Sequence, residues 1–448
     1  MHAEQIVKKA IASGLDEAVA TVYRYRRAYM KIANSKIDSL VKKYSEGAYL
    51  FVSSKKRVLF TNIDDLSELS IAKGIKNAKY LVEKEKPKDD YYGIADGPFK
   101  YMNKEPIYDN KLAHADDAAL SDIAEKSLYN VLDSGASSVA GIVVVGSSSE
   151  EMATSKGVGV EGKATYMRLS LRAFFGTVSV QDTIASRSLS GINHKELSDR
   201  LATTALGINK FGRISAGIYD TIYAPSPAGL IFSNVNSMAC MGSVETGSPF
   251  IGKLGKQVAN NGLSIYDDGI RQDAVNSSLY DAEGVPSQRT LLIKNGVLQT
   301  YLHNYSTAVK YKTKSTGNAG LVEPTPNTAE LEHKNNKKDL YALMQELGKG
   351  ILITNIWYLR FSNDVTGSFS VVPRDLAIYI EHGEPKFAIK HIAGTEATGI
   401  RISDNIIRTL LNTEATGGKA VQSTSWDAEG YYYYMPYVLV RGVRFTVA

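Results

Sequence analysis

One segment decides the class of fold: residues 18–60, AVATVYRYRRAYMKIANSKIDSLVKKYSEGAYLFVSSKKRVLF. β-Branched and aromatic residues dominate 18–26 and 28–33, and each run predicts a strand. Asn34-Ser35 is expected to turn the chain into a returning strand at 36–41. The segment therefore begins with a β-hairpin.

A second hairpin and a helix follow directly. Residues 47–60 predict two strands, 47–52 and 56–60, with a turn at Ser53-Ser54. Asn62 or Asp64 is then expected to cap a helix that ends near Val82, because apolar residues recur there at helical spacing. Hairpins and helices in succession, without a regular alternation of strand and helix, are typical of an α+β fold.

The N-terminal residues predict an amphipathic helix with Ile6, Ala10 and Ile11 on its apolar face. They lack the long apolar core of a signal peptide, and no apolar run in the sequence is long enough to span a bilayer. Further helices are expected at 116–132 and 194–209. We therefore expect a soluble protein with no membrane segment.

The sequence becomes rich in strands from about residue 218. Asn295-Gly296 suits a type I′ turn between two short strands, and His382-Gly383 repeats this arrangement. Lys338–Leu347 is the one clear helix of this half, and 403–411 also has helical character. The second half is therefore expected to contain mainly strands.

The length predicts more than one domain, because 448 residues exceed an ordinary single domain. We place the boundary near Ser215, where the character of the sequence changes. It separates an N-terminal α+β domain of hairpins and helices (1–215) from a C-terminal strand-rich domain with few helices (216–448).

The net charge is small for a chain of this size, since 52 Lys and Arg oppose 47 Asp and Glu and leave +5. No block of Lys and Arg matches a row of phosphates, so nucleic-acid binding receives little support. The single cysteine, Cys240, excludes an intrachain disulfide and fits a reducing, cytoplasmic compartment.

Gly157, Gly159 and Gly162 match the spacing G-x-G-x-x-G of dinucleotide-binding turns. That function requires a strand directly before the glycines and a helix directly after them. Polar residues 146–156 precede them instead, and 163–168 has the pattern of a strand. A glycine turn between two strands is the better interpretation.

The remaining chemical signals are weak. The seven histidines are His2, His114, His194, His303, His333, His382 and His391. None pairs with another at the three- or four-residue spacing of two metal ligands on one helix. The carboxylates of 267–269 and 281–286 lie beside glycines, where a turn is favoured over a cation site. Tyr431–Tyr434 favours a core edge or a protein interface over base stacking.

Several motifs together resemble one family. They are Asp281-x-Glu283-Gly284-Val285-Pro286-x-Gln288-x-Thr290, Ser315-Thr316-Gly317-Asn318-Ala319-Gly320, Thr366-Gly367-Ser368-Phe369-Ser370, Tyr379–Glu384, Ile392-Ala393-Gly394 and, in the first half, Asn34–Ser39. In these motifs the chain resembles the TldD/PmbA family, and the resemblance covers nearly the whole sequence. It implies an α+β fold with a strand-rich C-terminal domain.

Residues 228–260, AGLIFSNVNSMACMGSVETGSPFIGKLGKQVAN, correspond to the family's metal-binding helix. TldD-type members are similar to zinc metallopeptidases, in which H-E-x-x-x-H supplies two ligands and a later cysteine another. Those helix positions correspond here to Ser233, Asn234 and Met238, and Cys240 belongs to the predicted helix itself. A serine hydroxyl is a poor zinc ligand, an amide is no general base and a thioether is soft. The chain therefore resembles the PmbA branch of the family, also called TldE.

That branch implies a non-catalytic subunit with no cofactor of its own. The expected partner is a TldD-like metallopeptidase subunit that holds zinc in a heterodimer, and the expected substrate is an unfolded or short peptide. Two loops are the expected peptide or partner contacts. Their residues are Ser315, Thr316, Gly317 and Asn318 in the first loop and Asp364, Thr366 and Gly367 in the second.

Two other functions stay open. One is an autonomous hydrolase that uses other residues, because catalytic triads are distant in sequence and leave no local signature here. The other is a regulator that binds DNA or a DNA-acting enzyme, which the near-neutral charge disfavours.

Overall fold

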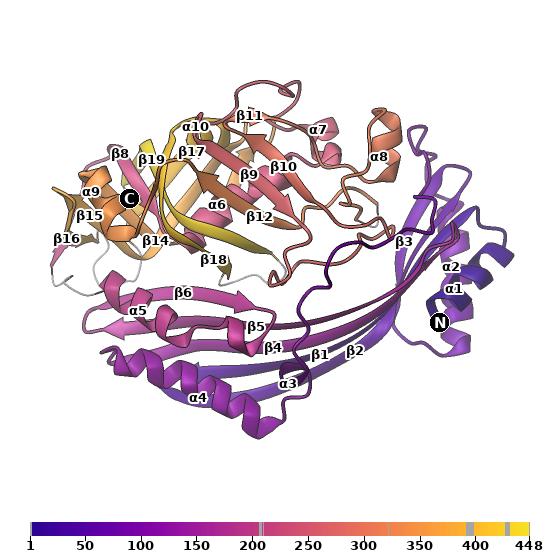
Figure 1. Cartoon of the computed structure of the whole chain (residues 1–448), viewed down its shortest axis with the longest axis horizontal. Helices are drawn as coiled ribbons and strands as arrows, with labels where there is room; N and C mark the ends of the chain where they lie inside the picture. Colours follow the sequence, from indigo (N-terminus) through magenta and orange to yellow (C-terminus); the bar gives the residue numbers. More distant parts are fainter. Residues whose placement is uncertain are drawn as a thin grey trace.

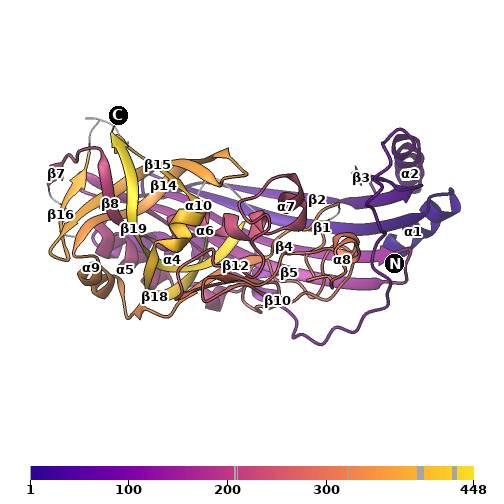
Figure 2. The ribbon, with the colours of Figure 1, turned by 90° about the horizontal axis from the view of Figure 1, so that it is seen from above.

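The computed structural model describes residues 2–205, 208, 210–320, 322–390, 398–425 and 431–447. Two β-sheets with accompanying helices form this part of the chain, which confirms the α+β fold (Figure 1). The first sheet curves beneath the second, and its concave face is turned toward it. Seen from above, the long strands of the first sheet extend along most of the molecule (Figure 2).

The first sheet has the strand order β3-β2-β1-β4-β5-β6, and every neighbouring pair is antiparallel. Its strands are β1 (Glu17–Ala33), β2 (Lys36–Ser54), β3 (Arg57–Ile63), β4 (Ser138–Thr154), β5 (Gly159–Phe175) and β6 (Val178–Ser186). Asn34 and Ser35 have φ of 49° and 57°, which confirms the predicted first turn.

The strands of this sheet are longer than predicted. Residues 18–26 and 28–33 belong to one strand, because Arg27 stays paired with Lys43 on one side and Gly146 on the other. In a strand, a polar side chain projects from one face of the sheet without interrupting the backbone ladder. β2 likewise joins the two segments that were predicted separately.

The second hairpin turns two residues later than predicted. Ser53 and Ser54 pair with Val58 and Arg57, and the turn is formed by Lys55 and Lys56 with φ of 48° and 61°. The prediction of Ser53-Ser54 is therefore wrong, because both serines are held in the ladder.

The N-terminal helices are α1 (His2–Ala12), α2 (Glu68–Val82), α3 (Asn110–Ala113), α4 (Asp117–Asp133) and α5 (His194–Ala205), with a 3₁₀ turn at Leu189–Gly191. α1 buries Ile6 and Ala10 as expected, but Ile11 is 36% exposed and Val7 lies inside instead. α4 confirms the helix predicted at 116–132, and the side chain of Asp116 is its N-cap.

The cap of α2 differs from the prediction. The side chain of Ser67 accepts a hydrogen bond from the backbone N–H of Ser70, so Ser67 is the N-cap. Asn62 and Asp64 come too early, because β3 continues to Ile63. The predicted end of this helix, Val82, is confirmed.

The glycine motif begins in a turn between two strands, as predicted, although Gly159 and Gly162 already belong to the second strand. β4 ends at Thr154 and β5 begins at Gly159, so only a short turn separates them. Gly157 in this turn has φ of +86°, a conformation that glycine adopts without strain. Lys163 and Arg168 lie in β5 rather than in a helix.

The second sheet is mixed, with the order β11-β10-β9-β12-β19-β8-β14-β15-β16-β7. β13 pairs with β18, β18 pairs with β19, and β17 pairs with both β15 and β19. Its strands are β7 (Phe211–Gly212), β8 (Gly217–Tyr223), β9 (Leu263–Asp268), β10 (Arg289–Lys294), β11 (Val297–Leu298), β12 (Thr328–His333), β13 (Asn336–Lys337), β14 (Lys349–Asn363), β15 (Ser368–Glu381), β16 (Glu384–Ile389), β17 (Ile400–Asn405), β18 (Thr413–Thr424) and β19 (Tyr432–Val447). The predicted boundary near Ser215 falls between β7 and β8, two strands of this sheet.

Both predicted hairpin turns are confirmed. Asn295 and Gly296 have φ of 49° and 82° between β10 and β11. His382 and Gly383 have φ of 56° and 74° between β15 and β16. Two consecutive positive φ angles are the signature of the type I′ turn.

The helices of this part are α6 (Pro225–Met238), α7 (Met241–Thr246), α8 (Tyr305–Lys310), α9 (Leu340–Leu347) and α10 (Ile406–Leu411). α9 confirms the helix predicted at Lys338–Leu347, but this half of the chain also contains α6, α7, α8 and α10. The helix predicted at 403–411 begins later, because Asn405 ends β17 and its side chain caps α10.

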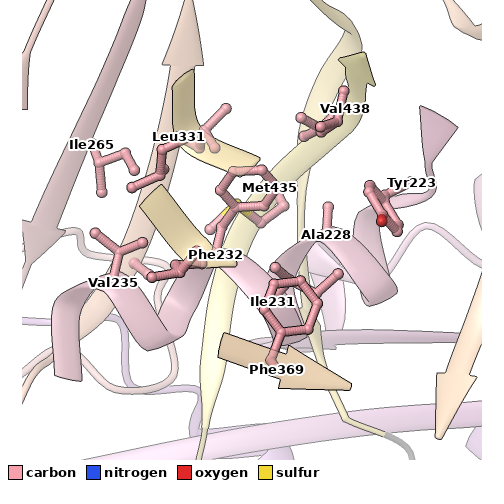
Figure 3. Packing of buried hydrophobic residues seen from close by; sticks show 14 of the residues in the cluster. Tyr223, Ala228, Ile231, Phe232, Val235, Ile265, Leu331, Phe369, Met435 and Val438 are labelled. Carbon is pink, nitrogen blue, oxygen red and sulfur yellow. The ribbon is translucent and has the colours of Figure 1, made fainter. Parts of the chain in front are cut away.

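A buried cluster surrounds α6 (Figure 3). The helix directs Ala228, Ile231, Phe232 and Val235 into it, and each is fully buried. Strands β9, β12, β15 and β19 supply the surrounding side chains, among them Ile265, Leu331, Phe369, Met435 and Val438. α6 is therefore the central element of the C-terminal core.

Arg187, directly after β6, joins the two sheets. Its side chain is 1% exposed, and its Nε donates to the carbonyl of Ile107 at 2.8 Å. Nη1 donates to the carbonyls of Ala274, Val275 and Ser277 at 3.0–3.2 Å. Burial lowers the pKa of this guanidinium to about 10. The two sheets are thus connected by a buried cation that backbone carbonyls solvate.

Candidate functional site: a cavity beside α6

One face of α6 is polar and borders a cavity. Pro225 begins the helix at a position where its missing N–H is not needed. Opposite the apolar stripe, Ser233, Asn234 and Ser237 line a cavity of about 310 Å³. The candidate site therefore lies on the helix that corresponds, by the family resemblance, to the metal-binding helix of TldD-type members.

An irregularity in β14 forms the facing wall. The pairing of β14 with β15 slips between Trp357 and Arg360, and Tyr358 has φ of 54°. The rings of Trp357 and Tyr358 stack at 4.4 Å, and both line the cavity. A left-handed tyrosine costs about 1–2 kcal/mol, which the surrounding packing must offset. The bulge therefore holds two aromatic rings beside the polar face of α6.

The tyrosine run completes the cavity. Tyr432 and Tyr433 are buried and line it, whereas Tyr431 is 65% exposed at its rim. The Tyr433 hydroxyl donates to the carbonyl of Ser226 at 3.0 Å and so ties β19 to the start of α6. The prediction that this run packs at a core edge is confirmed.

A buried carboxylate holds two residues of the cavity wall in place. Asp267 is fully buried and accepts hydrogen bonds from the side-chain amides of Asn236 (3.0 Å), Asn318 (2.7 Å) and Asn327 (3.1 Å). The backbone N–H of Asn327 donates as well, at 2.8 Å. Burial raises the pKa of Asp267, and the four hydrogen bonds oppose that rise. Asp267 thus positions α6 and two loops together.

The structure separates the three positions of the degenerate motif. Ser233 and Asn234 line the cavity, and the Asn234 amide donates to the carbonyl of Leu230 at 2.7 Å. Met238 is 9% exposed and belongs to the apolar cluster. Cys240 lies beyond the end of α6 as the N-cap of α7, so its predicted place inside the helix is wrong. Burial raises the pKa of its thiol.

Zinc does not fit this donor set. The wall offers hydroxyls, amides and phenol rings, whereas zinc sites in proteins use thiolate, imidazole and carboxylate ligands. Within the described residues, no group of three or more His, Cys, Asp or Glu is placed to hold a metal ion. His391 and the family motif Ile392-Ala393-Gly394 lie outside the described residues.

The first predicted contact loop packs inward. Asn318 is 2% exposed and holds Asp267, and Gly317 is buried with φ of +67°. Thr316 and Ser315 are half-buried, and their hydroxyls donate to the carbonyl of His303. None of these residues lines the cavity beside α6.

The second predicted contact loop is the tip of the β14–β15 hairpin. Asp364 and Thr366 are exposed there, and Gly367 is buried with φ of +69°. This loop does not line the cavity either. A role of the two loops in peptide or partner contact stays a prediction.

Sequence reasoning missed Trp357, Tyr358, Arg360 and Asp267 as residues of the site. The sequence has no local signal for the first three, because they reach the cavity through a slip in the pairing of β14 with β15. Asp267 was interpreted as a turn residue, although it lies within β9 and accepts hydrogen bonds from Asn236 and Asn327, which line the cavity.

No helix in the described ranges combines the length and apolar character that crossing a membrane requires.

The sequence and the fold are both similar to those of known PmbA and TldD proteins. Residues 216–447 match the model of the PmbA/TldA metallopeptidase C-terminal domain. An uncharacterised protein of Methanocaldococcus jannaschii is 26% identical over 83% of this chain and 86% of its own length. A metalloprotease PmbA homolog of Haemophilus influenzae is 31% identical over 36% of this chain and 34% of its own length.

Among solved structures, TldE from Thermococcus kodakarensis superposes with a TM-score of 0.83 at 20% identity, over the full length of both chains. This likeness shows that the fold is TldE-like. Since the family model matches just over half of the sequence, the chain belongs to the PmbA/TldD metallopeptidase family.

Proposed function

We propose that this chain is the metal-free, TldE-like subunit of a heterodimeric metallopeptidase, whose TldD-like partner holds the zinc. The proposal rests on the side chains at the three positions that correspond to the family's metal-binding motif. Ser233 and Asn234 line the cavity without a side chain suited to zinc or to general-base catalysis, and Met238 is part of the core.

The retained scaffold supports a role as partner. Asp267 holds α6 and its neighbouring loops in place although no ligand set remains there. In the proposed complex, this subunit helps to enclose an unfolded or short peptide and to exclude water around the partner's zinc. We place the complex in the cytoplasm, because the single cysteine is buried and needs no oxidising compartment.

The test is a reconstitution with three samples: this chain, its TldD-like partner and the mixture. Each is assayed for cleavage of an unfolded peptide and for zinc by elemental analysis. We expect the mixture to cleave the peptide and the two chains to co-elute. We expect zinc in the partner and none in this chain. Stoichiometric zinc and peptidase activity in this chain alone would contradict the proposal.

The same samples distinguish the two alternative functions. Hydrolysis by the isolated, chelator-treated chain would indicate an autonomous enzyme. Salt-sensitive binding to duplex DNA would indicate a DNA-associated regulator.

A further inference from the structure

A second and larger cavity, of about 490 Å³, lies on the concave side of the first sheet. Its walls come from β4 and β5, from residues 105–108 and from residues 277–280. It shares no lining residue with the cavity beside α6. It is thus a separate site between the two sheets.

The walls of this cavity are fixed by Arg187. The buried guanidinium donates to Ile107 beside the first wall segment and to Ser277 in the second. Nη2 also approaches the carbonyl of Lys163 in β5, at 3.4 Å. Because one buried side chain holds three of the walls, the cavity keeps its shape without a ligand.

Glu150 of β4 supplies an acidic group without a cationic partner. Its Oε1 accepts a hydrogen bond from the Tyr25 hydroxyl at 2.9 Å, and no Lys or Arg of the described chain forms an ion pair with it. Burial raises the pKa of Glu150, so its ionised form is poorly solvated. Such a carboxylate is stabilised by a cation that enters the cavity.

Tyr280 supplies a second unsatisfied group. Its side chain is 6% exposed, it lines the cavity, and its hydroxyl has no hydrogen-bond partner among the residues that the structure describes. The hydroxyl lies over Gly162, where a Cβ atom would be 2.7 Å away. Gly162 is the ladder partner of Glu150, so the hydroxyl and the carboxylate are close together.

The remaining charges favour a cationic ligand. Three exposed charged side chains, Glu105, Glu161 and Lys163, also line the cavity, so two carboxylates there oppose one ammonium. The Arg187 guanidinium is turned to backbone carbonyls. A primary ammonium group has one positive charge and three donors, which match a carboxylate and a phenol oxygen.

We propose that this cavity binds a primary ammonium group, with Glu150 as its counter-ion and Tyr280 as a second hydrogen-bond partner. The ammonium is either the N-terminus of a peptide or a lysine side chain. The proposal does not depend on the proposed role of the chain as the metal-free subunit of a peptidase, because it concerns binding by this chain alone.

Calorimetric titration of the purified chain with three short peptides tests the proposal. Ala-Ala-Ala amide carries only an N-terminal amine, acetyl-Ala-Lys-Ala amide carries only a lysine amine, and acetyl-Ala-Ala-Ala amide carries neither. We expect at least one of the amine peptides to bind and the neutral peptide not to bind. Which amine peptide binds identifies the source of the ammonium.

Two variants locate the binding. Glu150→Gln is expected to weaken it by about tenfold or more, the usual effect of losing a charge-assisted hydrogen bond. Glu151→Gln is the matched control, because Glu151 is the next residue of β4, accepts from the backbone N–H of His2 and does not line the cavity. It should bind like the unmodified chain.

Tyr280→Phe gives an independent check. Its hydroxyl has no partner, so its removal should weaken amine binding while leaving the unfolding midpoint unchanged. Equal binding of the neutral peptide, unchanged binding by both Glu150→Gln and Tyr280→Phe, or no binding of either amine peptide at millimolar concentration would overturn the proposal.

Discussion

The aromatic ring of Tyr433 lies against the backbone of Gly229, so closely that a Cβ atom at position 229 would overlap the ring. Tyr433 is fully buried on β19, and Gly229 is in the first turns of α6. Strand and helix can approach to this distance only because residue 229 has no side chain. This contact sets the position of the helix that borders the candidate site.

Gly229→Ala should therefore destabilise the protein. Alanine gains about 1 kcal/mol of helix propensity, but the overlap with a fully buried ring costs more, about 2–3 kcal/mol. We expect a lower free energy of unfolding in urea. Tyr433→Leu combined with Gly229→Ala should recover part of the loss; purely additive losses in the double variant would contradict the contact.

Arg187→Met should lower the free energy of unfolding by about 3 kcal/mol or more. The substitution leaves the carbonyls of Ile107, Ala274 and Ser277 buried without their donor. Arg213→Met is the control, because Arg213 is exposed. Equal urea midpoints for the two variants would show that Arg187 does not stabilise the junction.

A pair of neighbouring carboxyl groups, Glu283 buried and Asp281 half-buried, should make stability depend on pH. Asp281 accepts from the backbone N–H groups of Glu283, Val285 and Ala319, yet burial raises its pKa to about 7. Burial and the charge of Asp281 also raise the pKa of Glu283. A carboxyl whose pKa is higher in the folded state favours folding while it is protonated. Its contribution is complete below about pH 4 and is lost as the pH rises through about 7.

Glu283→Gln removes one of these ionisations while keeping an oxygen for the backbone N–H of Tyr305. We expect the variant to be more stable than the unmodified chain at pH 8, with a smaller difference at pH 4, in urea titrations at both values. Glu125→Gln, at an exposed position, is the control. A constant difference across this pH range would exclude the ionisation as its cause.

Met238→His alone should create neither zinc binding nor peptidase activity. Met238 is in the apolar cluster, so histidine there is desolvated, and Ser233 and Asn234 still provide no second ligand and no base. Elemental analysis and peptide cleavage by the isolated variant check this. The thermal midpoint should fall, and zinc-dependent cleavage would contradict our interpretation of α6.

The predictable parts of the fold are those that depend on local chemistry. Asn295-Gly296 and His382-Gly383 form the expected turns because few residue pairs adopt two positive φ angles. The turn of the second hairpin was misplaced because lysine rarely adopts a positive φ. Lys55 and Lys56 do so here because the pairing of the two flanking strands places the turn at these residues. Neighbouring strands, which are distant in sequence, decide such positions.

The candidate site was predictable only in part. Ser233 and Asn234 were found because the resemblance to the TldD/PmbA family places them at positions of its metal-binding motif. Trp357 and Tyr358 reach the same cavity from β14 through a slip in strand pairing, which depends on β15 and leaves no local pattern. Asp267 was missed for a similar reason, since its partners Asn236 and Asn318 come from separate elements.

The backbone carbonyls that accept hydrogen bonds from Arg187 affect how the stability of the protein depends on pH and salt concentration. Backbone carbonyls neither titrate nor exchange counter-ions, so below the pKa of Arg187, about 10, this junction keeps its hydrogen bonds through changes in acidity and ionic strength that weaken exposed ion pairs. The carboxyl pair at Asp281 and Glu283, by contrast, responds to acidity. The hydrogen bonds of Arg187 therefore persist over a wide range of pH and ionic strength, whereas the stability that Asp281 and Glu283 contribute changes with pH.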